Sequence, residues 1–404
     1  MGSDAALFSL DAGAGAGDGS TLSDGAADAA DAGPPFVGVD AGPPPADLEG
    51  FIRWHMAAGG LPGIAAAIVT RDGIAWQGTF GLAEVATSTP VDDATLFLVA
   101  SVSKPVSAVA LMQLVEQGRV DLDAPASTYT TFSIVNPTSP AGLTTTRMLL
   151  THTSGIEDAW VPLGRAGSAD DPTITLAEFA QGYVTDGGAF WSTDNFGAPP
   201  ATRWSYSNAG FGIGAYVAEA ESGERVADLV RNNVLVPLGM TSSGYFLSDL
   251  DPAHVATGYT YSRGSGFRAY PHQSWAFYPA AMLRTSLHDL SRFTRAMLRD
   301  GELDGARVLT PETVTEMRRR QVPGLRRAQA LVWSYQVIGA NEYLAHSGET
   351  SEGSAMVAMR WDTGKGIVLM TNCDAYLRAV AGLTEGRTAF EAILDRLDTE
   401  ASLP

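Results

Sequence analysis

The sequence predicts an α+β fold, with one antiparallel sheet flanked by terminal helices and a mostly helical inserted lobe. Two β-like runs flank a turn signal at residues 71–73, and four more strand-like runs follow one another between residues 332 and 372. A helical and loop-rich stretch occupies roughly residues 100–320. We therefore expect the early hairpin and the late strands to meet in one sheet, with the terminal helices on one face and the middle region on the other.

The first ordered element is expected to be a helix that begins after Asp47, which is a suitable N-cap residue. Apolar residues at helical spacing follow it, and a glycine pair ends it: Leu48, Phe51, Ile52 and Met56, then Gly59 and Gly60. The hairpin GIAAAIVTRDGIAWQGTFG turns at Arg71-Asp72-Gly73. The late strands are expected at residues 332–338, 343–348, 354–360 and 366–372, and a final helix at about residues 377–397.

Residues 1–46 are rich in Gly, Ala, Asp and Pro, and the pentapeptide DAGPP occurs in them twice. Such a segment buries too little apolar surface to offset its conformational entropy, so we predict a disordered tether here and one folded domain at residues 47–400. Acidic tethers often join an export signal or lipid anchor to a folded domain. We therefore expect a periplasmic or cell-envelope location, although no signal peptide is evident in this sequence.

The charge of the chain argues against a nucleic-acid partner. The net charge is −19, and residues 1–52 hold nine acidic and no basic side chains, so the remainder still carries about −10. A basic patch of the kind that nucleic acid requires is absent from the sequence. No run of about 18 apolar residues occurs, and no membrane span is therefore expected.

The first candidate for chemistry is the pair Ser101 and Lys104 in ASVSKPVSAVALMQLVEQG. The chain has only two lysines against 24 arginines. Arginine does not release its proton in a protein, whereas a buried lysine can. A spacing of three residues places the hydroxyl and the amine on one face of a first helical turn, where the helix start favours a neutral amine and a serine alkoxide. The alternative is a lysine retained by chance.

The second candidate is the pair Tyr206 and Asn208 in WSYSNAGFGIGAYV. A tyrosine hydroxyl near a cationic amine ionises more easily and can act as a general base, while an asparagine amide can bind a substrate carbonyl. The alternative is an amphipathic tyrosine followed by a helix-capping asparagine.

The third candidate is HSGE, residues 346–349, at the end of a predicted strand. Gly348 permits close approach of an extended backbone, so the N–H of Glu349 can join that of Ser101 in an oxyanion hole. His346 by itself is a weak signal, because a structural role is the default for a histidine.

In this order, SVSK, YSN and HSG resemble the motifs of the serine penicillin-recognising family, which includes class C β-lactamases, D-alanyl-D-alanine carboxypeptidases and related esterases. The segments TLFLVASVSKPVSAVALMQLVEQGRVDLDAPASTY, LLTHTSGI and VLVPLGMTSSGY extend the resemblance to about residues 47–398. It implies a β-lactamase/transpeptidase-like fold and a serine hydrolase domain. The reaction implied is cleavage of a small ester or peptide-like amide through an acyl-serine intermediate, with no metal or organic cofactor.

The resemblance also implies a role for each motif residue. Ser101 is the nucleophile, and Lys104 with Tyr206 is the proton-transfer pair that activates it. The substrate-binding residues are Asn208, His346, Ser347 and Gly348, and the oxyanion hole is formed by the backbone N–H groups of Ser101 and Glu349. We interpret His152, in LLTHTSGI, as a turn residue and not as a catalyst.

Two departures from the β-lactamase pattern argue against a dedicated β-lactamase. His346 replaces the usual lysine, and Glu349 and Glu352 add negative charge beside it. An unperturbed histidine titrates near pH 6.5, so we expect activity on anionic substrates to rise as the pH falls. The alternative is that Arg284 or another arginine supplies the charge for a substrate carboxylate and His346 is only a hydrogen-bond donor.

The sequence leaves several activities open within this family. D-amino-acid peptidase, esterase, weak β-lactamase and acyl transferase are all compatible with the motifs, with a small ester, amide or peptide as the substrate. A different class is a binding or sensor module that is acylated once and does not turn over. The oligomeric state is equally open.

We predict that the tether is dispensable for catalysis and folding. Deleting residues 1–45 should change neither the turnover number nor the melting temperature, because the segment has too few large apolar residues to pack on the domain. Both quantities are measured on the full and the shortened chain. A fall of several degrees in the melting temperature would show that the segment docks.

Overall fold

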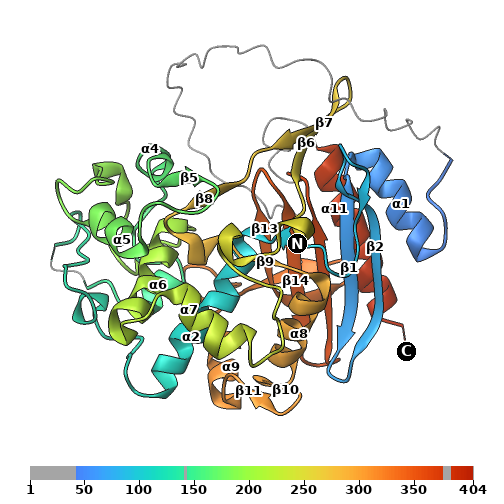
Figure 1. Cartoon of the computed structure of the whole chain (residues 1–404). Coiled ribbons are helices and arrows are strands. Elements are labelled where there is room, and N and C mark those ends of the chain that lie inside the picture. The colour runs from blue at the N-terminus through green and yellow to red at the C-terminus, as the bar shows by residue number, and fades with distance from the viewer. Residues whose placement is uncertain (1–41, 141–142, 376–383, 404) are drawn as a thin grey trace, which may run out of the picture. The chain divides into compact units, whose positions relative to one another are not determined.

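The computed structural model describes residues 42–140, 143–375 and 384–403. Its centre is a seven-stranded antiparallel sheet with the order β12-β13-β14-β15-β1-β2-β3. Figure 1 shows the N-terminal hairpin in blue beside the C-terminal strands in red. The strands are β1 Gly63–Thr70, β2 Ile74–Glu84, β3 Thr89–Pro90, β12 Ser334–Ile338, β13 Asn341–Glu349, β14 Ser354–Arg360 and β15 Lys365–Thr371. This sheet confirms the prediction that early and late strands combine.

The two ends of the chain meet where β1 pairs with β15. Their antiparallel register places Ala67 opposite Val368. Successive side chains of β1 point to opposite faces. Ile64, Ala66 and Ile68 therefore belong to the core on one side of the sheet, and alternate residues such as Ala67 belong to the core on the other.

The terminal helices cover the first of these faces, as predicted. α1 (Leu48–Gly59) begins after Asp47, whose side chain accepts a hydrogen bond from Gly50 N at 2.8 Å, and it ends at Gly60 with a φ of 61°. α11 (Glu385–Ala401) packs against α1 and β15. The final helix expected at about residues 377–397 agrees with α11 over residues 385–397, and α11 continues to Ala401. The start of that prediction falls on residues 376–383, which lie outside the described residues.

The opposite face carries α8 (Leu287–Leu298) and the inserted lobe (Figure 1). The lobe is helical as expected, but it also contains short strand pairs that the sequence analysis missed. Pairs of two to five residues give no readable alternation of polar and apolar side chains. The further helices are α2 Ser103–Glu116, α3 Thr146–Leu150, α4 Trp160–Gly164, α5 Leu176–Val184, α6 Asn208–Ser222, α7 Val226–Val230 and α9 Pro311–Arg318. The short pairs are β4 Phe97–Leu98 with β9 Arg284–Thr285, β5 Gly167–Ala169 with β8 Gln273–Trp275, β6 Gly258–Ser262 with β7 Gly266–Tyr270, and β10 Glu302–Leu303 with β11 Ala306–Arg307.

Over the part of the chain that the structure describes, none of the helices combines the length and the apolar character needed to cross a bilayer. The boundary predicted between residues 46 and 47 lies directly before α1. The tether prediction itself concerns residues 1–46, of which 1–41 are outside the described ranges.

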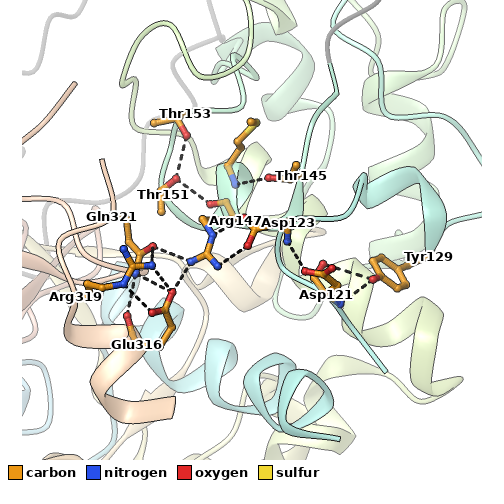
Figure 2. Close-up of polar contacts among 11 residues, drawn as sticks. Asp121, Asp123, Tyr129, Thr145, Arg147, Thr151, Thr153, Glu316, Arg319 and Gln321 are labelled. Atoms are coloured by element: carbon orange, nitrogen blue, oxygen red, sulfur yellow. Dashed lines mark hydrogen bonds and ion pairs between the residues drawn. The ribbon is translucent and has the colours of Figure 1, made fainter. Parts of the chain in front are cut away.

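An arginine clamp joins three segments of the lobe (Figure 2). Arg147 on α3 donates to both carboxylate oxygens of Asp123, at 2.7 and 2.8 Å, in the loop that follows α2. It also donates to Glu316 on α9 at 2.6 Å and to Gln321 at 2.8 Å. Hydrogen bonds to Asp123 and Glu316 raise the pKa of Arg147 above its ordinary value. The clamp therefore fixes α3, whose last turn leads directly into the segment at residues 151–155 beside the site described below.

We predict that Arg147→Ala lowers the free energy of unfolding by about 1–3 kcal/mol, because it removes charge-assisted hydrogen bonds that are only partly exposed. The matched control is Arg225→Ala, which breaks a more exposed pair with Asp228 and should cost about 0.5 kcal/mol. Urea unfolding of both variants gives the comparison. Equal losses would mean that the clamp adds nothing beyond a surface ion pair.

Candidate active site

Ser101 lies in a 3-10 turn, Ala100–Val102, that joins β4 to α2. Ala100 has a φ of 48°, a left-handed conformation that is costly for a residue with a Cβ atom. Hydrogen bonds pin the turn from both sides: Val99 N donates to Leu283 O at 3.0 Å, and Ser103 Oγ donates to Ala100 O at 2.5 Å. The turn leaves Ser101 partly exposed while its neighbours on either side are buried.

Lys104 is completely buried, and its amine contacts three oxygen atoms. Nζ lies 2.8 Å from Ser101 Oγ, 2.7 Å from Asn208 Oδ1 and 2.8 Å from Ala280 O. Burial lowers the pKa of this amine to about 7, against an opposing influence from the Asp158 carboxylate. The amine is therefore neutral in a large fraction of molecules at physiological pH.

The three contacts determine what the neutral amine can do. A neutral amine has two N–H donors and one lone pair, while the Asn208 and Ala280 oxygens can only accept. Both donors are then used by these two oxygens, and the lone pair is left for the proton of the Ser101 hydroxyl. The arrangement suits proton transfer from Ser101 to Lys104.

Tyr206 completes the contacts of the serine. Its hydroxyl lies 2.9 Å from Ser101 Oγ, and its ring lies 4.9 Å from Lys104 Nζ. Burial raises the pKa of Tyr206 above its ordinary value, and the Asp158 and Glu349 carboxylates add to this. The expectation of an easily ionised tyrosine is therefore wrong, because tertiary burial outweighs the nearby amine. Tyr206 therefore stays protonated and donates a hydrogen bond to Ser101 Oγ.

Asn208 is the first residue of α6 and does not cap it, because the capping side chain is Ser207, which accepts from Gly210 N at 2.8 Å. The Asn208 amide faces inward, with Oδ1 on Lys104 and Nδ2 donating to Asp158 Oδ2 at 2.7 Å. Asp158 is a site residue that the sequence analysis missed. It lies 50 residues before Asn208, and no short motif links the two.

His346 on β13 is nearly enclosed, with 7% of its surface exposed. Burial, and then the charge of Lys104, lower the pKa of His346 to about 3. The expected titration near pH 6.5 is therefore wrong, and the imidazole is neutral from pH 5 to 9. Its Nδ1 lies 2.6 Å from Ser347 O and donates to that carbonyl, which leaves Nε2 as an acceptor.

Gly348 brings β13 against the turn that carries the serine. A Cβ atom at this position would lie 2.0 Å from Val99 O and 3.1 Å from Ser101 N, so only glycine fits. The backbone at residues 348–349 and the amide of Ser101 are consequently neighbours. An oxyanion hole formed by Ser101 and Glu349 remains a prediction that this packing supports.

The charges next to HSGE are largely neutralised. Glu352 accepts from Gln273 N at 2.9 Å and contacts His272 at 2.8 Å and Arg284 at 3.5 Å. Arg284 is only 1% exposed, so its guanidinium pairs with Glu352 in the interior of the protein. Burial raises the pKa of Glu349 to about 7. The predicted excess of negative charge is therefore smaller than the sequence suggested.

His152 lies in a turn, as predicted, with a φ of 57° and a buried side chain. Its ring is 4.3 Å from the ring of Tyr206, and its Nδ1 accepts from Ser207 N at 3.2 Å. Burial, with the Lys104 charge, lowers the pKa of His152 well below its ordinary value. The His152 imidazole is therefore a neutral ring that packs against Tyr206.

Comparison with known proteins identifies the family. The model of the Beta-lactamase family matches residues 48–387. Protein Rv1367c of Mycobacterium tuberculosis is 28% identical over 295 residues, which are 67% of this chain and 70% of that protein. Esterase EstB of Burkholderia gladioli is 33% identical over 204 residues, about half of each chain (48% and 50%).

Among solved structures, the D-amino acid amidase of Ochrobactrum anthropi has the same fold. The TM-score is 0.69 at 21% sequence identity, with 88% of this chain and 98% of that chain covered. The fold class is therefore β-lactamase/transpeptidase-like, as predicted. This chain belongs to the β-lactamase family of serine enzymes, which includes penicillin-binding proteins and related hydrolases.

Proposed function

We propose that this enzyme cleaves a small ester or peptide-like amide that is uncharged next to the scissile bond, through an acyl-serine intermediate. The observation that carries the proposal is the position of Ser101 Oγ, 2.8 Å from the buried Lys104 amine and 2.9 Å from the Tyr206 hydroxyl. A serine hydroxyl is a weak nucleophile unless a neighbouring base takes its proton. Lys104, with a pKa of about 7, is that base.

In the proposed acylation step, Ser101 Oγ attacks the substrate carbonyl carbon while its proton passes to Lys104 Nζ. The oxyanion that forms is stabilised by the backbone N–H groups of Ser101 and Glu349. Tyr206 donates a hydrogen bond to the serine oxygen. When the tetrahedral intermediate collapses, Tyr206 passes its proton to the leaving oxygen or nitrogen and takes up the proton held by Lys104, which becomes neutral again. Water hydrolyses the acyl-serine in the second step, with Lys104 again as proton acceptor.

The preference for an uncharged substrate rests on the charges near Ser101. His346 and Arg284 were the named candidates for binding a substrate carboxylate, and Lys104 is a further basic side chain beside Ser101. Lys104 is occupied by the serine, Asn208 and a carbonyl, Arg284 is paired with Glu352, and His346 is neutral. An ester or amide without an adjacent carboxylate needs none of them, whereas a penicillin or cephalosporin does.

The names of two similar proteins support this range of substrates, since one is an esterase and the other a D-amino acid amidase. Turnover separates a hydrolase from an acylated sensor. Mass spectrometry over time with an ordinary short acyl ester is expected to show transient acylation of Ser101 and release of product. A stoichiometric adduct that persists would instead identify a sensor, and transfer of the acyl group to an added alcohol in preference to water would identify a transferase.

We predict that Lys104→Arg lowers kcat/KM at least about a hundredfold, because a guanidinium keeps the positive charge but cannot accept the proton. Ser101→Ala is the reference and should retain less than about a thousandth of the activity. In the wild type, kcat/KM should rise with pH through a midpoint near 7, since the neutral form of Lys104 is the active one. Retained activity in Lys104→Arg would show that Lys104 supplies only charge.

We predict that His346→Lys improves turnover of a cephalosporin relative to a short acyl ester by about tenfold, the equivalent of one added charge contact of about 1.4 kcal/mol. In the wild type, cephalosporin turnover relative to ester turnover should not increase as the pH falls from 7 to 5, because His346 stays neutral over this range. The control is His254→Lys on an exposed turn, which should change neither substrate. A parallel fall for both substrates in His346→Lys would contradict this account.

A further inference from the structure

The carboxylate of Asp158 collects four hydrogen bonds at the N-terminus of α6. Ser207 Oγ donates to Oδ1 at 3.1 Å and Ala209 N donates to Oδ1 at 2.9 Å, while Asn208 donates to Oδ2 through its backbone N at 3.0 Å and its Nδ2 at 2.7 Å. The first N–H groups of a helix have no partner within the helix, and a carboxylate is favoured there. Asp158 is therefore held firmly beside the YSN segment.

These contacts determine which way the Asn208 amide points. With Nδ2 on the Asp158 carboxylate, Oδ1 faces Lys104 Nζ at 2.7 Å. The flipped amide would place its oxygen against the carboxylate and its NH₂ group against the amine donors, so both contacts would be lost. We propose that Asp158 is a positioning residue of the reaction, whose carboxylate orients Asn208 so that Oδ1 holds the Lys104 amine against Ser101.

The charge of Asp158 has a second consequence. Lys104 is faced by Tyr206, by His152 in its turn and by His346 on β13, none of which carries a charge near neutral pH. Burial lowers the pKa of Lys104, and Asp158 is the charged group that opposes this effect. Removal of the Asp158 charge should therefore make Lys104 neutral at a lower pH.

This inference rests on the proposed function, because it assumes that Lys104 activates Ser101. The test is Asp158→Asn in the full chain, with a short acyl ester as the substrate. We expect kcat to fall roughly ten- to a hundredfold, as for a misplaced catalytic group, with little change in KM. The acid limb of the kcat/KM profile should move to lower pH by roughly one unit.

A control variant distinguishes a positioning role of Asp158 from a purely structural role. Asp289 on α8 is a buried carboxylate that accepts from Ser242 N at 3.1 Å and Ser243 Oγ at 2.8 Å, neither of which is a motif residue of the site. Asp289→Asn should lower the melting temperature but leave the acid limb in place. An unmoved acid limb in Asp158→Asn, or an unchanged kcat, overturns the proposal.

Two further variants keep the test decisive. In the Asn208→Ala background, the additional change Asp158→Asn should lower kcat by less than about twofold, because Asp158 acts through Asn208. If Asp158→Asn lowers kcat in that background by as much as it does in the wild type, the proposal is overturned. If Asp158→Asn does not fold, Asp158→Glu replaces it. This variant keeps the charge but moves the carboxylate, so kcat should fall while the acid limb stays; a wild-type kcat would overturn the positioning role.

The same assay separates this inference from the proposed function. If Ser101→Ala and Lys104→Arg remain active, the proposed function fails, and the role of Asp158 that rests on it fails as well. If both are inactive while Asp158→Asn behaves like the wild type, only the role of Asp158 fails.

Discussion

The active site depends on the burial of a single amine. Lys104 has no exposed surface, and among the residues that the structure describes its Nζ is bonded to a hydroxyl, an amide oxygen and a carbonyl but to no carboxylate. A charged ammonium loses hydration in such a place, so its pKa falls to about 7 and the lone pair becomes available to Ser101. Arginine would remain charged there, which gives a physical reason for a lysine in a chain that otherwise relies on arginine.

The fold supplies this burial by packing the lobe and the serine turn against the sheet at β13 and β14. Lys104 comes from α2 and Asn208 from α6, while β13 packs on the turn that holds Ser101 (Figure 1). Gly348 lets the strand approach, and the Arg147 clamp fixes the neighbouring α3 (Figure 2). Ser101 stays partly exposed at the boundary, so that substrate can reach it.

The sequence predicted what depends on local spacing. The hairpin at residues 71–73 and the pair Ser101 and Lys104 follow from contacts a few residues apart. Properties set by distant packing were not predictable: the raised pKa of Tyr206, the neutral state of His346 even at pH 5, and the part played by Asp158. Burial sets the first two, because it raises the pKa of Tyr206 and lowers that of His346 from their ordinary values. The third joins segments that share no motif.

The protonation state of Lys104 can be measured directly, because the chain has only one other lysine, Lys365. Lysine labelled with ¹³C at Cε gives two signals in the NMR spectrum, and a Lys365→Arg variant assigns them. Titration of the resting enzyme is predicted to show the Lys104 signal changing with a midpoint near pH 7. A midpoint near the ordinary lysine value of about 10.4 would contradict the account, since the amine would then be charged at neutral pH and unable to accept the serine proton.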